Sequence, residues 1–565
     1  MSPFTFKIGG AAGFGIMSTG LTFSKLAARS GYQVFDYAEY PSLIRGGHNV
    51  MQTTVADKSV NSPRRSTNLL VALNQETVAR HYHELTPGAT LLYDKELVTN
   101  VADVPNGVHL IAVPLQHLAK AAGGTILMRN TVALGASVAL LGGKLTLLVD
   151  LINEEFAAKS PEIKQKNQTA ALAGYDYLRA NYPNNITPIL APRRAPRSWV
   201  ITGNEAAGLG ALSAGMQFAA IYPMTPTSNI LHFLAPLQPE FNFICQQPED
   251  EIAAINLAIG ASFAGARAMV ATAGGGFSLM VEGYGLAGMT ETPLVIIEGM
   301  RPGPATGLPT WTGQADLRFL LHAHQDEFPR LVLAPGDPQE TFNLTRQAFN
   351  LAEIYQTPVV ILLDKYLCES HWSAPDLPAE KFKIERGKLI TRQLKNYRRY
   401  ALSAEGISPR ALPGSGNHIL ANSDEHNEAG YSEESAENRQ QQMEKRMKKL
   451  VTCANNHLPS PRRYGPPEAS TTIISWGSTK GPILDALPSL PDVNFIHLTW
   501  LNPFPAAALR PMLKSSQRVI NIENNYSGQL QGLIAETTGI SLKENLLKYD
   551  GRPFYPEEII EFLTA

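Results

Sequence analysis

Short apolar runs alternate with segments of helical spacing along most of the chain. In residues 1–185, runs such as FTFKI, NLLVAL and VHLIAV flank the amphipathic segment IMSTGLTFSKLAARSG. Residues 199–375 repeat the alternation with PLVIIEGM and PVVILLD, which are apolar almost throughout. Strands that are buried on both faces have this composition. The pattern therefore predicts α/β domains, each with a mostly parallel sheet covered by helices.

Two stretches of different composition interrupt this pattern and suggest domain boundaries. Residues 186–198 are rich in proline and basic residues, which is typical of a linker. Residues 376–467 are polar, and ENRQQQMEKRMKKL is their one convincing helix. Apolar runs return in residues 468–565. We expect an α/β domain over 1–185, the linker, a second α/β domain over 199–375, the polar connecting segment, and a small α/β domain over 468–565.

The composition narrows the class of protein. Of the 565 residues, 44% are hydrophobic and 17% charged, and the formal net charge is -2. These values describe a globular protein without the basic excess of a nucleic-acid-binding chain. No apolar run is long enough to predict a membrane span, and the N-terminus lacks the pattern of a signal peptide. The cysteines are few and far apart, so we expect a cytoplasmic protein without disulfides, a cysteine-ligated cluster or a metal of its own.

The segment IYPMTPTSNI combines two prolines with Thr225, Thr227 and Ser228 at a predicted strand end. Proline cannot continue a strand, but it is favoured at the first helical position. We therefore expect a strand through Tyr222, Thr225 as N-cap and Pro226 at the first position of a helix. Such a corner directs backbone N–H groups at one point and suits an anion. A capped helix without a ligand would explain the same residues.

Other predicted strand ends in the second α/β domain also carry groups that could bind ligands. Glu251 heads a helix whose next turns, AAINLAIGASFAG, are small and apolar. Poor solvation there would suit a carboxyl group for proton exchange, although acidic residues are common at helix N-termini for electrostatic reasons alone. Ligands of open α/β sheets collect at strand ends. The remaining candidates at such ends are Gly274, Gly275, Arg301, Thr306 and Thr310.

The first α/β domain offers a glycine-rich turn, GGAAGFG, and a later loop, YPSLIRGGHN. Gly10, Gly13 and Gly15 would let backbone N–H groups approach a phosphate, and Arg45 could add a fixed positive charge. Their spacing departs from the usual dinucleotide pattern. A tight turn and a charged loop are the plain alternatives.

Seven motifs, in order, resemble the 2-oxoacid:ferredoxin oxidoreductase family over nearly the whole chain. They are GNEAAGLGALSAG, YPMTPTS, EDEIAAINLAIGAS, RPGPATGLPT, GISPRALPG, DEHNEAG and IENNYSGQL. The resemblance is to an alpha subunit with a gamma domain fused at its N-terminus. It implies a multidomain α/β protein, with a gamma domain, a pyrimidine-binding domain of the thiamine-diphosphate fold and a transketolase-C-terminal-like domain.

The resemblance implies an enzyme that is active only together with a beta subunit. That subunit would carry the diphosphate site, Mg2+ and a [4Fe–4S] cluster. The implied assembly is a dimer of heterodimers. The implied reaction is coenzyme-A-dependent oxidative decarboxylation of 2-oxoglutarate to succinyl-CoA, with electrons passed to ferredoxin, and it is reversible. GISPRA and DEH resemble the 2-oxoglutarate type; pyruvate or a broader range of 2-oxoacids is the alternative. A non-catalytic subunit, or a transketolase-like or NAD-linked enzyme, agrees less well with the motifs.

By the same resemblance, Glu251 would hydrogen-bond N1′ of the thiamine pyrimidine and exchange a proton with it. Thr225 and Arg301 would hold the 2-oxo-carboxylate. The other implied contacts are substrate with Tyr222, Thr306 and Thr310, thiamine diphosphate with Gly274 and Gly275, and coenzyme A with Gly10, Gly13, Gly15 and Arg45. Phe14 departs from the family pattern, since glutamine is usual there, and DEHNEAG is expected to be a solvated loop without a metal-binding role.

Overall fold

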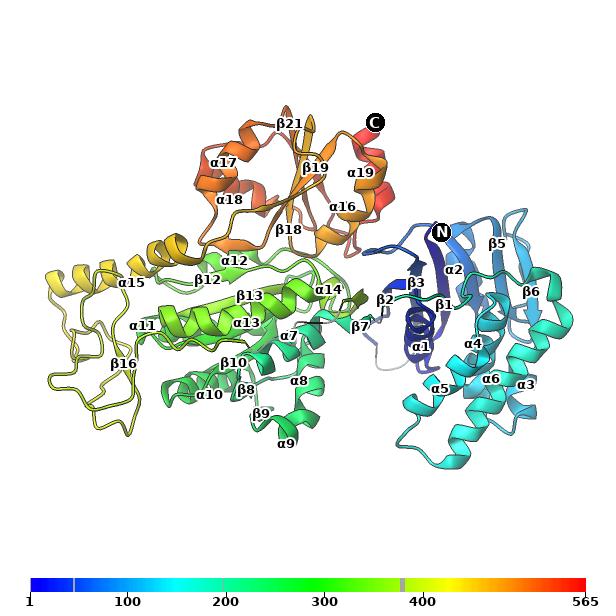
Figure 1. Ribbon diagram of the computed structural model, residues 1–565, viewed down its shortest axis with the longest axis horizontal. Helices are drawn as coiled ribbons and strands as arrows, with labels where there is room; N and C mark the ends of the chain where they lie inside the picture. Colours follow the sequence, from blue (N-terminus) through cyan, green and yellow to red (C-terminus); the bar gives the residue numbers. More distant parts are fainter. Residues whose placement is uncertain (1, 44–45, 197, 376, 378–381) are drawn as a thin grey trace. The chain divides into compact units, whose positions relative to one another are not determined.

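The computed structural model divides the chain into two compact units (Figure 1). The residues that it describes are 2–43, 46–196, 198–375, 377 and 382–565. Unit 1 comprises Met1–Ile201, Ser370–Asp376 and Tyr555–Ala565, and unit 2 comprises Thr202–Glu369 and Leu377–Phe554.

Unit 1 is built on an eight-stranded sheet with the order β6-β5-β4-β1-β3-β2-β14-β7. Its strands are β1 (Phe4–Ala11), β2 (Gln33–Glu39), β3 (His48–Ala56), β4 (Thr67–Ala72), β5 (Leu85–Asp94), β6 (His109–Val113), β7 (Trp199–Thr202) and β14 (His371–Ala374). Its helices are α1 (Ile16–Arg29), α2 (Gln75–His81), α3 (Leu115–Ala121), α4 (Arg129–Leu140), α5 (Leu145–Glu155), α6 (Pro161–Asn181) and α19 (Pro556–Thr564). Apolar side chains of β1, α1, α4 and α6 share one core, which includes Phe6, Phe23 and Leu178.

This sheet is mixed, which corrects the expectation of a mostly parallel sheet in the first α/β domain. β1, β4, β5 and β6 pair in parallel, whereas β3 is antiparallel to β1 and β2, and β14 is antiparallel to β2. Residues 40–47 alone join β2 to β3, and a connection this short cannot cross over to a parallel partner. The apolar pattern missed β3 because its sequence, HNVMQTTVA, is largely polar.

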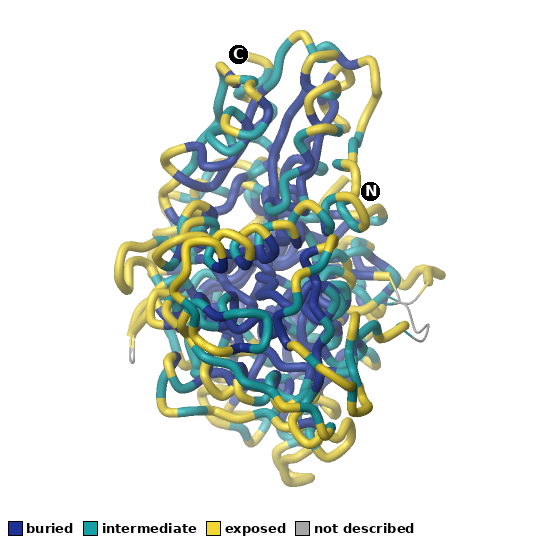
Figure 2. The backbone as a smooth tube through the Cα atoms, turned by 90° about the vertical axis from the view of Figure 1, so that its left-hand side faces the viewer, coloured by how far each residue is buried: buried dark blue, intermediate teal, exposed yellow. Residues whose placement is uncertain are grey.

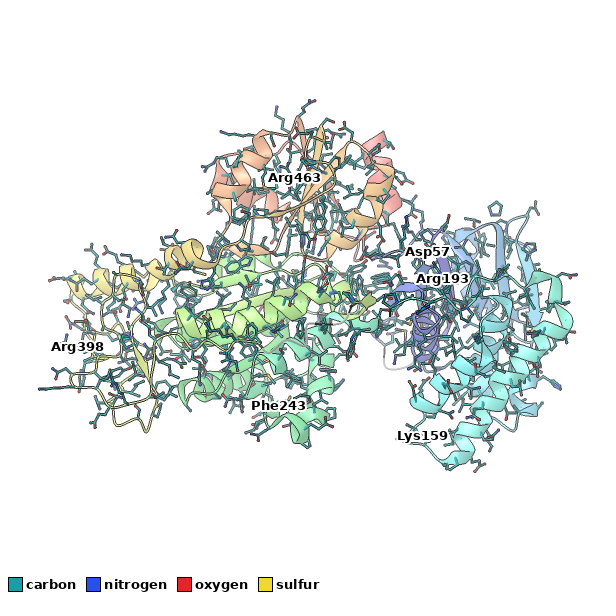
Figure 3. All side chains as sticks on the ribbon, in the orientation of Figure 1. Asp57, Lys159, Arg193, Phe243, Arg398 and Arg463 are labelled. Carbon is teal, nitrogen blue, oxygen red and sulfur yellow. The ribbon has the colours of Figure 1, made fainter. Side chains whose placement is uncertain are left out.

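The proline-rich segment expected as a linker packs on the core of unit 1. Leu190 is fully buried in that core, and the backbone N–H of Arg193 donates to the Ser30 carbonyl at 2.8 Å. The Arg193 guanidinium lies over the Tyr32 ring, and one of its nitrogens is 3.7 Å from a carboxylate oxygen of Asp57 (Figure 3). Where it is described, this segment is therefore attached to unit 1.

The larger sheet of unit 2 has the order β20-β12-β13-β11-β10-β8-β9 and is parallel except at β20. Its strands are β8 (Phe218–Ala220), β9 (Ile244–Gln246), β10 (Ala268–Ala273), β11 (Leu294–Met300), β12 (Leu331–Leu333), β13 (Pro358–Asp364) and β20 (Trp500–Asn502). The helices around it are α7 (Gly203–Ser213), α8 (Ser228–Leu234), α9 (Gln238–Phe241), α10 (Glu251–Phe263), α11 (Gly274–Met289), α12 (Leu317–His322), α13 (Pro338–Tyr355) and α14 (Lys365–Glu369). β10, β11 and β13 are buried along their whole length, as their apolar runs predict; buried backbone is dark blue in Figure 2.

A second, five-stranded sheet of unit 2 has the order β17-β19-β18-β21-β22. Its strands are β17 (Arg462–Tyr464), β18 (Thr471–Trp476), β19 (Val493–Leu498), β21 (Arg518–Glu523) and β22 (Glu544–Leu547), with helices α16 (Lys480–Ala486), α17 (Ala506–Lys514) and α18 (Gln529–Thr538). β20 leaves this region and pairs with β12 at the edge of the larger sheet. The last α/β region and the second one therefore share a sheet.

The polar connecting segment contains the expected helix, α15 (Ala436–His457), and the short strands β15 (Leu389–Ile390) and β16 (Arg410–Ala411). Two lysines of α15 form ion pairs outside this segment. The ammonium groups of Lys445 and Lys449 lie 2.5 and 2.6 Å from the carboxylate of the fully buried Glu291. Among the described residues, no helix combines the length and the apolar composition that a membrane crossing needs.

The DEHNEAG motif is packed against α15, so the expectation of a solvated loop is wrong. The carboxylate of Glu425 accepts hydrogen bonds from both terminal nitrogens of Arg446, at 2.8 and 2.6 Å. His426 is fully buried, and its ring centre lies 3.8 Å from that of Tyr400. The motif thus connects two parts of the polar segment.

Candidate active site

The helix after the YPMTPTS corner begins later than the sequence predicts. α8 starts at Ser228, with Thr227 at the N-cap position. Thr225 as N-cap and Pro226 at the first helical position are therefore wrong. The chain first makes a turn closed on the Met224 carbonyl, which accepts hydrogen bonds from the backbone N–H of Thr227 at 2.9 Å and of Ser228 at 3.1 Å.

The side chain of Arg301 contacts the backbone of Thr225 at this corner. Nη1 of Arg301, just after β11, donates to the Thr225 carbonyl at 2.7 Å. On the other side, Asn204 of α7 donates to the Pro226 carbonyl at 2.8 Å. Nε of Arg301 is buried and has no hydrogen-bond partner among the described residues. The guanidinium is therefore held in place while donors remain for a carboxylate.

Glu251 is the first residue of α10, but another acid caps that helix. Oδ1 of Asp250 accepts a hydrogen bond from the backbone N–H of Ala253 at 2.7 Å. Glu251 is 3% exposed, and its buried Oε1 has no partner in the part of the chain that is described. A Cβ on Gly276 would lie 2.7 Å from this oxygen, so the first turn of α11 passes directly against the carboxyl group.

The N-terminus of α11 carries the two glycines expected near a cofactor. Ala273 at its N-cap makes no side-chain hydrogen bond to the helix, so its side chain satisfies none of the first backbone N–H groups. A Cβ on Gly275 would meet nothing closer than the Ala305 carbonyl at 3.9 Å and the Met224 sulfur at 4.0 Å. The helix start therefore borders open space between the YPMTPTS corner and the loop after β11.

Sequence reasoning missed two acids beside Arg301. Glu298 of β11 is fully buried, and neither of its carboxyl oxygens has a hydrogen-bond partner among the described residues. The carboxyl group of Asp316 lies close to Gly274, where an added Cβ would be 2.4 Å from Oδ2. Burial, and then the neighbouring acids, raise the pKa of Glu298 well above its usual range. Burial also raises the pKa of Asp316 to about 6. A single acid inside the apolar run PLVIIEGM was the signal that could have revealed Glu298.

The candidate substrate contacts beyond Arg301 differ in exposure. Thr306 is exposed and Tyr222 partly exposed, whereas Thr310 is only 5% exposed. The loop that carries both threonines packs against the last α/β region, where the Arg552 guanidinium lies 3.4 Å from the ring centre of Trp311. Thr306 and Tyr222 can reach a ligand from solvent, while Thr310 belongs to the packed base of the loop.

In unit 1, the glycine turn lines a cavity of about 370 Å³. Gly13 and Gly15, both lining residues, have φ angles of 86° and 73°, which favour glycine. Gly10 lies within β1 and is not a lining residue. Asn130 fixes the turn, since its Nδ2 donates to the Phe14 carbonyl at 3.1 Å. Arg45 lies outside the described residues.

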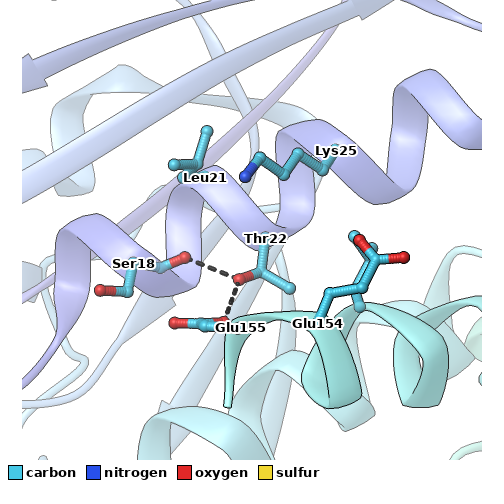
Figure 4. Close-up of a pocket in the computed structure, with 7 residues that line it drawn as sticks. Ser18, Leu21, Thr22, Lys25, Glu154 and Glu155 are labelled. Carbon is cyan, nitrogen blue, oxygen red and sulfur yellow. Dashed lines mark hydrogen bonds between the residues drawn. The ribbon is translucent and has the colours of Figure 1, made fainter. Parts of the chain in front are cut away.

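A smaller cavity of about 220 Å³ adjoins the first along α1 (Figure 4). Ser18, Thr22 and Glu155 line both cavities. Oγ1 of Thr22 donates to the Glu155 carboxylate at 2.9 Å. The larger cavity also reaches residues of α4 and α6, among them Asn130 and Asn167.

Comparison with known proteins assigns the chain to a family. The family described as "Pyruvate flavodoxin/ferredoxin oxidoreductase, thiamine diP-bdg" matches residues 209–445, and "Pyruvate ferredoxin/flavodoxin oxidoreductase" matches residues 5–177. The 2-oxoacid:ferredoxin oxidoreductase subunit alpha of Sulfolobus sp is 35% identical, over 99% of this chain and 96% of the relative. The chain belongs to the 2-oxoacid:ferredoxin oxidoreductase family, as an alpha subunit.

Other relatives of this alpha subunit are named for 2-oxoglutarate. The 2-oxoglutarate oxidoreductase subunit KorA of Mycobacterium tuberculosis is 30% identical, over 99% of this chain and 91% of the relative. The solved 2-oxoglutarate:ferredoxin oxidoreductase of Magnetococcus marinus, with 2-oxoglutarate, coenzyme A and succinyl-CoA bound, has a TM-score of 0.93 and 30% identity. That similarity covers 100% of this chain and 99% of the solved one. The family resemblance, the multidomain α/β class and the oxidoreductase class expected from the sequence are thereby confirmed, and Thr225, Glu251 and Arg301 fall within the thiamine-diphosphate-binding match.

Proposed function

We propose that this alpha subunit takes part in the coenzyme-A-dependent oxidative decarboxylation of 2-oxoglutarate to succinyl-CoA and CO2. Two electrons pass to ferredoxin, and the cycle can run backwards as reductive carboxylation. The observation that carries the proposal is the convergence of the unpartnered Glu251 carboxyl group, the N-terminus of α11 and the Arg301–Thr225 pair. The two relatives named for 2-oxoglutarate favour this substrate; pyruvate or a broader range of 2-oxoacids is the alternative.

The residues of this site are suited to thiamine diphosphate. When bound, the cofactor supplies a carbon nucleophile for the 2-oxo carbon and accepts the electron pair left by CO2. Glu251 offers one buried, unpartnered oxygen, which can hold or move a proton at a ring nitrogen such as N1′ of the pyrimidine. Gly275 keeps a side chain away from the start of α11, which leaves room for a ring, whereas Gly274 makes room for the carboxyl group of Asp316.

Arg301 is proposed to bind the carboxylate next to the 2-oxo group. A planar guanidinium gives a carboxylate two parallel N–H donors, and the hydrogen bond to Thr225 orients it before the substrate arrives. Thr225 therefore contributes its carbonyl to position Arg301, in place of the N-cap donor expected from the sequence. Thr306 and Tyr222 are proposed near the distal carboxylate of 2-oxoglutarate, and Thr310 would support their loop from below.

A partner subunit is proposed to complete the site. Three large apolar residues, one each on β9, α10 and α11, are exposed, namely Ile244 at 57%, Ile252 at 50% and Leu279 at 51%. Exposed apolar groups on neighbouring elements are typical of protein interfaces. We propose that a beta subunit carrying the diphosphate site, Mg2+ and a [4Fe–4S] cluster covers them, in a dimer of heterodimers.

Coenzyme A is proposed to bind unit 1. Gly13 and Gly15 line a cavity beside the N-terminus of α1, a place that suits a phosphate. Gly10 would act only through the shape of the turn, and Arg45 would add charge. A cytoplasmic location and the domain boundaries expected at 199, 376 and 468 are part of the same proposal, with the segment expected as a linker attached to unit 1 where it is described.

Replacement of Glu251 tests the mechanism. In the complex with the beta subunit, Glu251→Gln should lower the rate of dye or ferredoxin reduction by about 10²–10⁴-fold, because the amide cannot exchange the proton. Asp250→Asn is the matched control, since asparagine is an equally good helix cap. It should retain turnover. Full activity of Glu251→Gln with normal partner binding would refute the role of Glu251.

The substrate is tested in the same assay. Reduction rates with 2-oxoglutarate and pyruvate, each with and without coenzyme A, should show the higher kcat/KM for 2-oxoglutarate and dependence on coenzyme A. A higher kcat/KM for pyruvate would overturn the substrate choice while leaving the proposed chemistry intact.

A further inference from the structure

A buried arginine at the start of α4 has no partner that accepts a hydrogen bond. Arg129 is the first residue of α4 and is 4% exposed. Its Nε is buried without a hydrogen-bond partner, and its terminal nitrogens make no hydrogen bond or ion pair among the described residues. A charged group that is buried without a partner costs free energy. An anionic ligand would remove this cost.

The ring of Phe14 holds this guanidinium beside the glycine turn. Cζ of Arg129 lies 4.4 Å from the centre of the Phe14 ring, a distance at which the face of an aromatic ring attracts a cation. Phe14 stands between Gly13 and Gly15, and all three residues line the cavity of about 370 Å³. The aromatic residue that departs from the family pattern therefore places a positive charge next to the wall of this cavity.

The N-termini of α1 and α4 meet at the same turn. Nδ2 of Asn130, the second residue of α4, donates to the Phe14 carbonyl at 3.1 Å and to Oγ1 of Thr19 in α1 at 2.9 Å. Neither helix has a side-chain hydrogen bond from its N-cap residue, and a helix N-terminus carries a partial positive charge. An anion at the turn would therefore face two helix N-termini as well as the Arg129 guanidinium.

The acids in this part of unit 1 leave the guanidinium free. Burial lowers the pKa of Arg129 and the charge of Asp94 raises it. Asp94 accepts a hydrogen bond from the backbone N–H of Glu96 at 3.1 Å, and it forms no ion pair with Arg129 among the described residues. Glu155, the acid that lines the cavity, accepts a hydrogen bond from Thr22. The terminal nitrogens of Arg129 thus remain available to a ligand.

We propose that Arg129 binds a phosphate group of coenzyme A and that Phe14 positions its guanidinium for this contact. The inference rests on the proposed binding of coenzyme A to unit 1. A guanidinium offers a phosphate two parallel N–H donors, and the backbone N–H groups at the start of α1 add further donors. The thiol and the pantetheine chain of coenzyme A need no contact with Arg129. The contribution of Arg129 is therefore specific to acyl acceptors that carry phosphate.

Arg129→Gln in the assembled enzyme is the test. The dissociation constant of coenzyme A, measured by titration calorimetry, should rise about 10–100-fold, because charge-assisted hydrogen bonds to an anion are lost. Pantetheine has the same thiol but no phosphate. The ratio of kcat/KM for coenzyme A to kcat/KM for pantetheine should therefore fall by the same factor. A general defect of the fold would lower both values and leave their ratio at the wild-type level.

Two further variants and one analogue sharpen the result. Arg179 is the matched control, since its guanidinium also lies over an aromatic ring of unit 1, that of Tyr175, but it is exposed and does not line the cavity. Arg179→Gln should keep the wild-type dissociation constant. Phe14→Leu keeps the apolar bulk without the ring face and should raise the constant about 2–10-fold. An equal loss for Arg129→Gln with 3′-dephospho-coenzyme A assigns Arg129 to the diphosphate, and a smaller loss assigns it to the 3′-phosphate.

A wild-type dissociation constant for Arg129→Gln, or an unchanged ratio of the two acyl acceptors, would overturn the proposal. If Arg129→Gln does not fold, Arg129→Lys decides, because it keeps the charge but loses the planar pair of donors and should also bind coenzyme A more weakly. Gly15→Ala separates the two hypotheses, since Gly15 has a φ of 73° and a Cβ there would lie 2.8 Å from Nδ2 of Asn130. Wild-type affinity in both Gly15→Ala and Arg129→Gln refutes the proposed coenzyme A site, whereas weaker binding in Gly15→Ala alone refutes only the role of Arg129.

Discussion

A single methyl group added at Gly276 should displace the carboxyl group of Glu251. In Gly276→Ala the new Cβ would lie 2.7 Å from Oε1 and 2.9 Å from Cγ of Glu251, and it would also overlap Oγ1 of Thr272. Such distances are shorter than real Cβ contacts. Glu251 and Thr272 are 3% and 0% exposed, so neither side chain can move into solvent to make room.

The size of the effect follows from this overlap. The contact with Oε1 is roughly 1 Å shorter than an ordinary van der Waals contact. Displacing a catalytic group by about 1 Å costs about 10²-fold in rate, and overpacking a buried site costs about 1–3 kcal/mol of stability. We therefore expect kcat of Gly276→Ala to fall about 100-fold, with a loss of about 1–3 kcal/mol in the free energy of unfolding.

Gly260→Ala is the matched control, because Gly260 lies on the same helix as Glu251 and a Cβ there would meet nothing within 4 Å. Alanine in a helix interior adds up to about 1 kcal/mol of stability, so this variant should be as active as wild type and at least as stable. The assays are ferredoxin or dye reduction by the assembled enzyme and denaturant unfolding. A Gly276→Ala enzyme with wild-type kcat would refute the placement of Glu251 as the proton-exchanging group.

Two further predictions concern buried charges. Burial raises the pKa of Glu84, but its hydrogen-bond and ion-pair partners outweigh burial and lower the pKa to about 2. Stability from Glu84 is thus fully present above its ordinary pKa of 4.5 and is lost as the pH falls towards 2. Glu84→Gln should therefore flatten the acid side of the thermal stability profile, and an unchanged profile would contradict this. Glu291→Ala leaves Lys445 and Lys449 buried without their carboxylate. The free energy of unfolding in urea should therefore fall by about 3–5 kcal/mol. A fall below about 1 kcal/mol would show that these ion pairs do not hold α15 in place.

The local pattern of the sequence determined the fold class and most elements of unit 2. β10, β11 and β13 were predictable because a strand buried on both faces must be apolar along its whole length. The order of the motifs also determined the family, which the comparisons confirm. These features depend on residues that are close together in the sequence, so they can be predicted from the sequence alone.

The start of α8 shows where local reasoning ended. Thr225 and Pro226 fit the sequence rules for a helix start. In the structure, however, the Met224 carbonyl accepts the hydrogen bonds of a turn from the backbone N–H groups of Thr227 and Ser228, and the helix begins at Ser228. β14 and β20 likewise pair with strands far away in the sequence. No local rule anticipates such pairings, because long-range packing decides which strand edges meet.

Tertiary structure alone brought the chemistry of the site together. Gly276 lies against Glu251, and the Arg301 guanidinium donates to the Thr225 carbonyl, although these residues come from different parts of the chain. Burial then changes the acidity of a group: the pKa of Glu298 is raised well above that of an exposed glutamate. The sequence shows which acids and glycines are present. The pKa of each acid and the groups that it can contact depend on how the folded chain excludes solvent.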